Sequence, residues 1–379
     1  MVHALLDATA MPVNRGGVGR YLDGLIPELA RLADVELSVA AQAHDRDQLL
    51  AAGVTAVAVP RFLANRAARM AWEQVGLPAL ARRLGAEVIH SPHYTMPLPS
   101  SVPVVVTLHD ATFFSDPNLH TVLKRRVFRT ATRRAVRKAA ALIVPSQATR
   151  SELERLVSPL ASRAIVAAHG VDTATFHPPT PAECGEVRRL LSLDERPYVA
   201  FLGTLEPRKN VPNLIRAWVR SASQRPEATT LVLAGGPGWD SEVSTALAEV
   251  PSGLRVVRAG YLPVDQLAGL LGGAAVVAYP ALGEGFGLPV LEAMACGAAV
   301  LTTRRLSLPE VGGDAVAYSE VDVASLATAL SALLSDPIRA EQLGRAAVAR
   351  AKEFTWARSA RQHAVAYEQA RTVNRADGR

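Results

Sequence analysis

The sequence predicts an α/β protein built from two parallel sheets, each covered by helices. Short apolar runs alternate with longer helical patterns along the chain, and each run is apolar through its length, as strands buried on both faces are. The length of 379 residues, at about 150 residues to a domain, favours two domains. With 49% hydrophobic and 20% charged residues, the composition excludes wholesale disorder.

The predicted strands fall into two series that a proline-rich connector separates. The first series comprises residues 2–6, 35–40, 88–91, 103–108, 141–145 and 164–168, and the second comprises residues 198–203, 230–234, 254–259, 274–279 and 298–302. Pro178, Pro179 and Pro181 favour an extended connector over residues 172–181. We therefore expect one domain over residues 1–176, a second over 177–356, and a last helix from 357 that ends in a frayed tail over 371–379.

Positive charge is concentrated in the first half of the chain. Residues 1–176 hold 20 Lys and Arg against 14 Asp and Glu, whereas residues 177–379 hold 21 of each. Much of the excess lies in an amphipathic helix predicted over residues 124–138, whose basic face includes Lys124, Arg125, Arg126, Arg129, Arg133 and Arg137. Such a helix can lie on an anionic membrane or contact phosphate groups, and the alternative is a solvated face of an ordinary helix.

The cysteines and the apolar segments suggest a cytoplasmic protein. Cys184 and Cys296 form no CxxC pair, so neither a disulfide framework nor a structural zinc site is expected. The N-terminal stretch lacks a basic region and contains Asp7, which argues against a secretory signal. The longest uncharged run, residues 266–283, contains several glycines and Pro280 and is typical of a helix end followed by a buried strand.

Three loops that follow predicted strands contain residues suited to binding a phosphorylated ligand. The first, residues 14–21, contains Gly16 and Gly17, which can take positive φ and present N–H groups ahead of a helix; a plain tight turn is the alternative. The second, residues 203–210, begins at Gly203 and contains Arg208 and Lys209. These two cations can neutralise a diphosphate, although such residues also occur on ordinary surfaces.

The third loop carries the strongest pattern, because two carboxylates bracket a glycine turn at a helix start. Glu284 precedes the turn, Pro289 suits the first helical turn, and Glu292 follows within a largely apolar helix. The amides near Gly287 would then be open to a ligand. A buried carboxylate needs hydrogen-bond donors, and the vicinal hydroxyls of a ribose would satisfy Glu292 better than an isolated surface position does.

Glu284 to Glu292 matches the E-x7-E signature of retaining glycosyltransferases of family 4, which the chain resembles over nearly its whole length. Further segments agree in order and spacing: residues 16–21, 108–110, 144–146, 169–172, 203–210, 234–236 and 354–356. The resemblance implies the GT-B fold, with two Rossmann-like domains facing each other across a cleft and a C-terminal helix that crosses back to the first domain. It also implies a hexosyltransferase with a nucleotide-sugar donor in the second domain and a glycan or lipid-linked acceptor in the first.

The resemblance assigns roles to residues of these motifs. Glu292 contacts the donor ribose, Arg208 and Lys209 bind the diphosphate, and His109 is the histidine of the cleft or, alternatively, caps a strand. The donor-binding set is Gly16, Gly17, Gly203, Arg208, Lys209, Glu284, Phe286, Gly287, Leu288 and Glu292, and the catalytic set is His109, Arg208, Lys209 and Glu284. The family is thought to retain configuration by attack on the face from which the diphosphate departs; a covalent route through a carboxylate is the competing chemistry.

Several alternatives remain at this point. The loop at residues 15–21 is most similar to bacterial mannosyltransferases, which favours GDP-mannose, while UDP-linked sugars are the alternative. A nucleotide-sugar 2-epimerase shares the architecture, whereas a phosphorylase would need a pyridoxal phosphate lysine signature. Nucleic-acid binding is not expected, because no groove-reading motif accompanies the basic helix. The D-x-D pattern Asp45-Arg46-Asp47 is interpreted as a solvated charged loop, so neither a cofactor nor a catalytic metal is expected.

Overall fold

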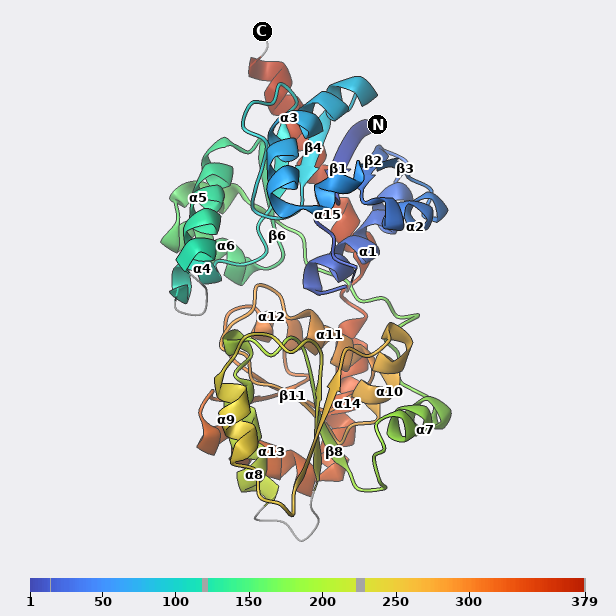
Figure 1. The fold of residues 1–379 in the computed structure, drawn as a ribbon, viewed down its shortest axis with the longest axis vertical. Coiled ribbons are helices and arrows are strands. Elements are labelled where there is room, and N and C mark those ends of the chain that lie inside the picture. The colour runs from blue at the N-terminus through green and yellow to red at the C-terminus, as the bar shows by residue number, and fades with distance from the viewer. Residues whose placement is uncertain (14, 118–121, 223–228, 378–379) are drawn as a thin grey trace. The chain divides into compact units, whose positions relative to one another are not determined.

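The computed structural model describes residues 1–13, 15–117, 122–222 and 229–377. The chain forms two compact units, one of Met1–Gly170 with Thr355–Arg379 and one of Val171–Phe354. Each unit contains one parallel sheet with helices on both faces (Figure 1), which confirms the predicted fold class. The chain leaves the first unit after Gly170, before the boundary predicted after residue 176. The final helix belongs to the first unit.

The first unit has a seven-stranded sheet in the order β3-β2-β1-β4-β5-β6-β7, with every neighbouring pair parallel. The strands are β1 (Val2–Asp7), β2 (Val35–Ala41), β3 (Thr55–Ala58), β4 (Val88–Ser91), β5 (Val104–Thr107), β6 (Ala141–Val144) and β7 (Ile165–Val166). Strand β3 was not among the predicted strands. It is a short edge strand of four residues, all of them exposed or partly exposed, although residues 54–59 are nearly all apolar.

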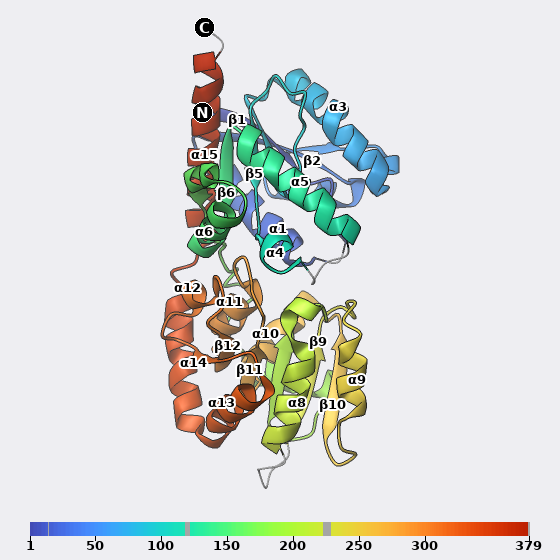
Figure 2. The same cartoon turned by 90° about the vertical axis from the view of Figure 1, so that its left-hand side faces the viewer.

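Helices cover both faces of this sheet. They are α1 (Gly17–Ala30), α2 (Arg46–Ala51), α3 (Arg66–Leu84), α4 (Thr112–Ser115), α5 (Val122–Lys138), α6 (Gln147–Leu156) and α15 (Trp356–Asp377). Figure 2 shows α15 on one side of the sheet and α3 and α5 on the other. Because α15 packs against α1, β1 and β6, the predicted return of the last helix to the first unit is confirmed.

The structure continues helix α15 into residues 371–377 of the tail that was predicted to be frayed over 371–379. Helix α15 continues to Asp377, and only residues 378–379 lie outside the described part. The Arg371 guanidinium donates a hydrogen bond to the Met1 carbonyl (3.2 Å) and forms an ion pair with Glu87 (3.6 Å). The helix is therefore held by contacts with distant segments, which no local sequence pattern reveals.

A buried set of histidines and tyrosines anchors α15. His363 Nδ1 donates to the Ser359 carbonyl (2.8 Å), so its Nε2 is left to accept from the Tyr21 hydroxyl (2.7 Å). His90 Nδ1 lies 2.9 Å from the hydroxyl of Tyr367. Since these partners come from α1, β4 and α15, the hydrogen bonds give the crossing helix a unique position in addition to apolar packing.

The second unit has a six-stranded parallel sheet in the order β10-β9-β8-β11-β12-β13. The strands are β8 (Tyr198–Leu202), β9 (Thr230–Ala234), β10 (Arg255–Gly260), β11 (Val276–Tyr279), β12 (Val300–Thr303) and β13 (Ala317–Ser319). Strand β13 was not predicted either. Like β3, it is a short, partly buried edge strand.

The helices of the second unit also form two layers (Figure 1). They are α7 (Pro181–Leu190), α8 (Val211–Ala222), α9 (Glu242–Ala248), α10 (Leu267–Gly272), α11 (Leu288–Ala295), α12 (Leu308–Gly312), α13 (Val323–Ser335) and α14 (Pro337–Ala351). Helix α8 packs against α9 and α13, whereas α7, α10, α11 and α14 contact one another in series. At the end of the proline-rich connector, Thr180 and Glu183 form a capping box that starts α7.

The expectations about cysteines and apolar segments have clear outcomes in the structure. Cys184 and Cys296 are free thiols. The uncharged run at 266–283 contains the short helix α10 and then the buried strand β11, as predicted. Within the described ranges, every helix is too short or too polar to cross a membrane.

Candidate active site

In the second unit, a cluster of buried ions lies at the carboxyl ends of β8 and β11. Arg208 and Lys209 belong to the short 3₁₀ helix η5 (Pro207–Lys209), and both donate to the carboxylate of Glu284. Lys209 Nζ lies 2.5 Å from Glu284 Oε1, while the Arg208 guanidinium contacts the other oxygen and also reaches Glu206 at 2.7 Å. The structure thus brings together three of the predicted catalytic residues.

The charges of this cluster balance one another. Burial raises the pKa of the Glu284 carboxyl, but the positive charges of Arg208 and Lys209 outweigh this effect and hold that pKa at about 2. Burial and the charge of Arg208 lower the pKa of the Lys209 ammonium, while Glu284 and Glu206 act in the opposite direction. With two cations and two carboxylates, the cluster holds both cations in place in the protein interior.

Tyr279 completes the cluster at the end of β11. Its hydroxyl donates to Glu284 Oε1 at 3.0 Å, and it also accepts a hydrogen bond from Lys209. Burial and the charge of Glu284 raise the pKa of this hydroxyl well above its ordinary value, so it stays protonated as a donor.

The glycine turn after Glu284 leads into α11, as the sequence predicts. Gly287 caps the helix with φ of 102°, and a Cβ at this position would lie 2.9 Å from the Leu308 side chain, so only glycine fits. Val290 and Leu291 donate the first hydrogen bonds of the helix to the Gly287 carbonyl (3.0 and 3.2 Å). The amides of Gly287 and Leu288 precede these donors, where the helix dipole favours an anion.

Ser307 supports this turn from the loop after β12. Its hydroxyl is fully buried and lies 2.8 Å from the Glu284 carbonyl and 2.9 Å from the Phe286 carbonyl. The Phe286 ring packs edge-on against Phe354. These contacts make Ser307 a positioning residue for the segment that carries Glu284.

Glu292 and Gly203 lie in the same unit as the ion cluster. Glu292, on α11, is only 2% exposed. Burial of the nearby Cys296 thiol raises the pKa of that thiol, and the negative charge of Glu292 raises it further. Gly203 follows β8 closely, and its carbonyl would be 2.2 Å from any Cβ at Gly235. The loops after β8 and β9 therefore approach each other at their backbones, as phosphate-binding loops require.

Gly16 and Gly17 lie in the first unit, and the expectation of positive φ there is wrong. Gly16 has φ of −79° and ψ of −168°, and Gly17 begins α1 without positive φ. A Cβ at either position would meet nothing within 4 Å, so the helix start presents an open backbone. Asn14, named in the same loop, lies outside the described residues.

His109 lies after β5 in the first unit, next to a ring cluster. Its Nε2 donates to the Pro92 carbonyl (2.6 Å), which leaves Nδ1 with the lone pair of the neutral ring. Burial lowers the pKa of His109, and the hydrogen bond to Pro92 and the charge of Asp110 only partly oppose this. The ring packs edge-on against Tyr21, with centroids 5.1 Å apart. The neutral ring of His109 can accept a hydrogen bond at Nδ1.

The interpretation of Asp45-Arg46-Asp47 as a solvated loop is correct for the exposed Arg46 and Asp47 but wrong for Asp45. Asp45 ends a 3₁₀ turn and is 2% exposed, and Arg46 starts α2. The Asp45 carboxylate accepts from the Arg15 guanidinium at 2.5 Å, so a distant residue of the glycine loop accounts for its burial. In the part of the chain that the structure describes, no three His, Cys, Asp or Glu side chains are grouped as a metal site would require.

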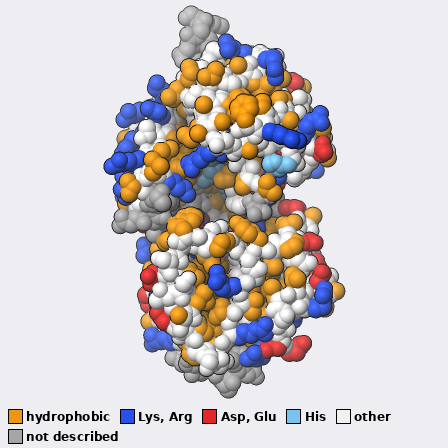
Figure 3. Space-filling view, viewed as in Figure 1, with side chains coloured by type: hydrophobic (Ala, Val, Ile, Leu, Met, Phe, Trp, Pro, Cys, Tyr) orange, Lys and Arg blue, Asp and Glu red, His pale blue; other side chains and the backbone are white. Residues whose placement is uncertain are grey.

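Helix α5 carries the predicted basic residues, and Lys and Arg side chains gather around it on the first unit (Figure 3). Thr132, Ala135 and Val136 are its buried residues. Its basic residues are not equivalent, because the Arg129 guanidinium donates to the Phe113 carbonyl at 2.7 Å whereas Arg126 is exposed. The sequence pattern could not distinguish these environments.

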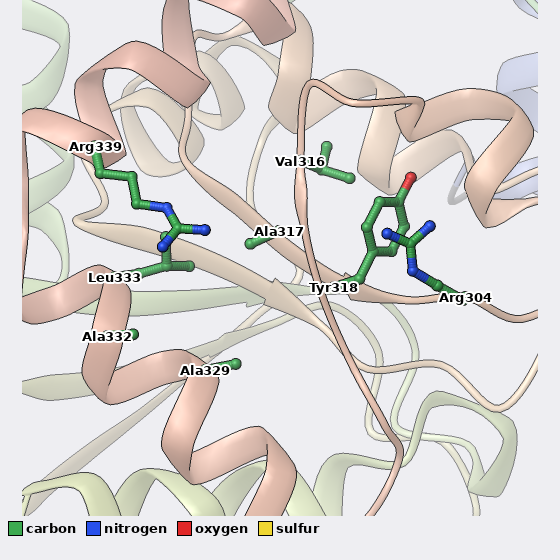
Figure 4. A pocket seen from close by; sticks show the side chains of 8 residues that line it. All are labelled: Arg304, Val316, Ala317, Tyr318, Ala329, Ala332, Leu333 and Arg339. Atoms are coloured by element: carbon green, nitrogen blue, oxygen red, sulfur yellow. The ribbon is translucent and has the colours of Figure 1, made fainter.

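A hollow of about 410 Å³ also lies at the β13 edge of the second unit (Figure 4). Arg339 stands on one side, and on the other the Arg304 guanidinium lies over the Tyr318 ring, 4.1 Å from its centroid. Alanines and apolar side chains form the rest of its lining. This hollow contains none of the residues predicted for the site.

Sequence reasoning missed Glu206, Tyr279 and Ser307. Glu206 stands beside the two predicted cations, and Tyr279 is the last residue of a predicted strand, so the rule that ligands gather at strand ends could have pointed to both. Ser307 follows the strand β12 in a segment without a recognisable motif. Its role depends on a contact between two loops.

Comparison with known proteins agrees with this geometry. The sequence profile described as "Glycosyltransferase Family 4" matches residues 15–175, and that described as "Glycosyl transferases group 1" matches residues 186–350. O-antigen chain mannosyltransferase B of Escherichia coli is 32% identical over 283 residues, which cover 74% of each chain. The chain belongs to glycosyltransferase family 4. As a family member it is a hexosyltransferase, which confirms the predicted class of enzyme.

Other relatives and solved structures extend the likeness over nearly the whole chain. The GDP-mannose-dependent alpha-(1-6)-phosphatidylinositol monomannoside mannosyltransferase of Mycolicibacterium smegmatis is 27% identical over 374 residues, 90% of this chain and 91% of the relative. Sucrose-phosphate synthase from Thermosynechococcus elongatus has a TM-score of 0.75 at 20% identity, covering 97% and 99%. Anabaena HepE in complex with UDP-glucose has a TM-score of 0.72 at 19% identity, covering 96% and 98%. The fold is GT-B.

Proposed function

We propose that the protein transfers mannose from GDP-mannose, with retention of configuration, to a hydroxyl group of a glycan or lipid-linked acceptor. The observation that carries the proposal is the ion cluster of Arg208, Lys209 and Glu284 beside the start of α11. This cluster suits a nucleotide diphosphate donor. The choice of mannose is supported by the mannosyltransferases among the relatives, one of which is named as dependent on GDP-mannose.

The proposed chemistry follows from the charge that develops on the donor. When the bond between the anomeric carbon and the diphosphate oxygen breaks, negative charge grows on the diphosphate. Arg208, Lys209 and the amides of Gly287 and Leu288 would stabilise that charge, and each such donor contributes about 3–4 kcal/mol in comparable sites. Glu206 and Glu284 orient the two cations beforehand, so little reorganisation is needed.

Retention requires the acceptor hydroxyl to attack on the face from which the diphosphate leaves. In the proposed reaction, the acceptor oxygen bonds to the anomeric carbon, the bond to the diphosphate breaks, and the hydroxyl proton passes to the departing phosphate. Glu284 is a poor covalent nucleophile in this arrangement, because Arg208, Lys209 and Tyr279 all donate to its carboxylate. That geometry favours direct attack over a glycosyl-enzyme intermediate.

A donor-hydrolysis screen tests the donor. GDP-mannose, GDP-glucose, UDP-glucose, UDP-galactose and ADP-glucose would be incubated separately with the protein, with release of the nucleoside diphosphate as the readout. We expect the fastest release from GDP-mannose. Preferred hydrolysis of a UDP-sugar would overturn the donor assignment, and the structural likeness to HepE in its UDP-glucose complex makes this the second candidate.

Proton NMR of the product then tests the rest of the proposal. An axial anomeric linkage from the axial donor is the expected product, and an inverted linkage would exclude retention. An incubation without acceptor separates transfer from 2-epimerisation, because an epimerase converts the donor sugar without any acceptor.

We further infer that α5 attaches the first unit to the inner surface of the membrane. Val122 and Leu123, at the start of α5, are 55% and 75% exposed next to Lys124 and Arg125. Exposed apolar residues beside basic ones suit an anionic lipid surface, where each basic residue contributes about 1 kcal/mol. A lipid-linked acceptor would then be within reach of the first unit.

Vesicle sedimentation tests this attachment. Binding to anionic but not to neutral vesicles is expected, with loss of binding when Arg126, Arg129, Arg133 and Arg137 are changed to glutamine. The matched control changes Arg61, Arg82, Arg83 and Arg155, which are exposed arginines elsewhere on the same unit, and should bind like the wild type. Equal partitioning of the α5 variant and the control would leave α5 as a solvated helix.

A further inference from the structure

A cavity of about 330 Å³ lies at the carboxyl ends of β1 and β4 in the first unit. Residues of α3 and α5, which lie on the same side of the sheet in Figure 2, complete its lining. Its inner wall includes Asp7, Glu73 and Ser91, which are 8%, 7% and 3% exposed. A cavity of this size at strand ends can hold a ligand as large as a monosaccharide.

Three polar atoms of this lining are buried and lack a partner among the described residues. They are Glu73 Oε1, Ser91 Oγ and His93 Nδ1. An unpaired buried polar group costs about 1–3 kcal/mol, and most buried polar groups in proteins are paired. Three such atoms in one cavity need partners, which buried water or the hydroxyls of a polar ligand can supply.

The groups of the inner wall suit the hydroxyls of a sugar or cyclitol. Burial and the neighbouring charge of Asp7 raise the pKa of Glu73 to about 7, while Thr95 and Arg69 act in the opposite direction. Asp7 Oδ1 accepts from Thr9 at 2.6 and 3.0 Å. Burial lowers the pKa of His93 to about 3, so its neutral ring offers one donor and one acceptor. With a pKa of about 7, the Glu73 carboxyl is partly protonated near neutral pH and can donate as well as accept, as His93 and Ser91 can.

Basic residues form the outer part of the same cavity. Arg66 and Arg69 come from α3 and Lys124 from α5. Arg66 is exposed and Arg69 partly so, whereas the two acids are buried. The cavity is therefore acidic inside and basic outside, an arrangement that fits a molecule with hydroxyls at one end and an anionic group at the other.

The hollow at the edge of β13 provides a contrast within the same protein. It is lined by Arg304 and Arg339, but its described lining includes no carboxylate. The combination of buried acids, unpaired polar atoms and outer cations thus distinguishes the cavity of the first unit from a merely basic depression.

We propose that this cavity binds a phosphorylated polyol, a sugar or cyclitol that carries a phosphate, and that this molecule is the acceptor. Its hydroxyls would pair with Asp7, Glu73, Ser91 and His93, and its phosphate with Arg66, Arg69 and Lys124. The role of this molecule as the acceptor rests on the proposed function, whereas its binding to the cavity does not. A soluble sugar phosphate and the headgroup of a phosphoglycolipid share this chemistry.

The test measures binding to the full chain without any nucleotide sugar. Isothermal titration calorimetry would use glucose 6-phosphate, mannose 1-phosphate, myo-inositol 1-phosphate, the unphosphorylated polyols and inorganic phosphate. A parallel arm would use phosphatidylinositol vesicles against phosphatidylglycerol vesicles of the same charge. We expect at least one phosphorylated polyol, soluble or in the vesicle, to bind about tenfold more tightly than its unphosphorylated form and than phosphate alone.

Variants separate the two ends of the cavity. Glu73→Gln should weaken binding of the phosphorylated polyol about tenfold, the loss expected for a charge-assisted hydrogen bond, and should leave binding of inorganic phosphate unchanged. Arg66→Gln combined with Lys124→Gln should weaken both ligands and, since Arg66 is exposed and Lys124 lies at the outer end, should leave the melting temperature unchanged. Arg83→Gln, an exposed position near the end of the same helix α3, is the matched control and should bind like the wild type.

The outcomes are separate from those of the donor screen. If no phosphorylated polyol binds more tightly than phosphate, or if the Arg66 and Lys124 variant binds like the Arg83 control, this inference is overturned even when GDP-mannose is hydrolysed. If a phosphorylated polyol binds as expected and no nucleotide sugar is hydrolysed, the cavity assignment stands and the proposed transfer fails.

Discussion

Two buried clusters, one in each unit, hold their titratable side chains in opposite ways. In the first unit, burial lowers the pKa values of His90, His169 and His363, so these rings are neutral and bind through hydrogen bonds and ring contacts. In the second unit, Lys209 and Glu284 are equally buried but paired as ions. The neutral cluster holds α15 in place, whereas the ionic cluster positions two cations where negative charge would develop on a diphosphate ligand. The comparison separates a structural use of buried polar groups from one suited to catalysis.

The largest effect is expected from breaking the ionic cluster. Replacing Arg208 and Lys209 with alanine should lower turnover by about 10³-fold or more, because each donor to a developing negative charge contributes about 10²–10³ in rate. Steady-state kinetics measures this, and the melting temperature reports folding. Arg216→Ala removes an exposed ion pair with Glu249 in the same unit and should change neither property appreciably. A double variant that lost activity only through unfolding would indicate a structural role for the two cations.

A change of pH should affect the neutral cluster first. Burial lowers the pKa of His363 to about 4, so the unfolded chain binds more protons than the folded one between about pH 6.5 and 4, and stability is lost as pH falls through this range. For His363 alone the loss between pH 7 and 5 should be about 2 kcal/mol. Glu284, with a pKa held at about 2, contributes stability that is lost only below about pH 4.5.

Chemical denaturation at pH 7, 6 and 5 measures this difference. His363→Gln should be less stable at pH 7 but should show a smaller loss between pH 7 and 5. Identical slopes for His363→Gln and the wild type would show that His363 does not couple protonation to folding.

A smaller effect is expected from Glu292, a buried carboxylate outside the ion pairs described above. Glu292→Gln should weaken binding of the nucleotide donor by about 1–3 kcal/mol, because a charge-assisted contact to the ribose hydroxyls is lost. Calorimetry with GDP measures the change, and a deoxyribose analogue should bind the variant and the wild type with similar affinity. Unchanged affinity for GDP would remove Glu292 from the donor site.

No measurable effect is expected from chelation. If Arg208, Lys209 and the start of α11 meet the charge of the diphosphate, turnover should survive prolonged treatment with EDTA followed by desalting. Activity restored only by added Mg²⁺ or Mn²⁺ would require a metal at the diphosphate. The ionic cluster would then not be sufficient to balance the charge of the donor.

Local patterns predicted most of the fold and the parts of the site that lie within single loops. The central strands were recognised because their residues are apolar through their length, and Arg208, Lys209 and Glu284 because they follow such strands. The edge strands β3 and β13 were missed although the edge strands β7 and β10 were predicted; β3 and β13 are only four and three residues long, and each is defined by its pairing with a neighbouring strand.

The features that escaped prediction all depend on partners far apart in the chain. Asp45 is buried because Arg15 pairs with it, and Ser307 matters because it joins the turn at Glu284. Residues 371–377 are helical, and Arg371 contacts Met1 and Glu87. Periodicity and turn chemistry are local and can be seen in the sequence. The pairing of a buried charge is settled only when folding brings a distant partner within hydrogen-bond reach, because the cost of burial is decided by that partner.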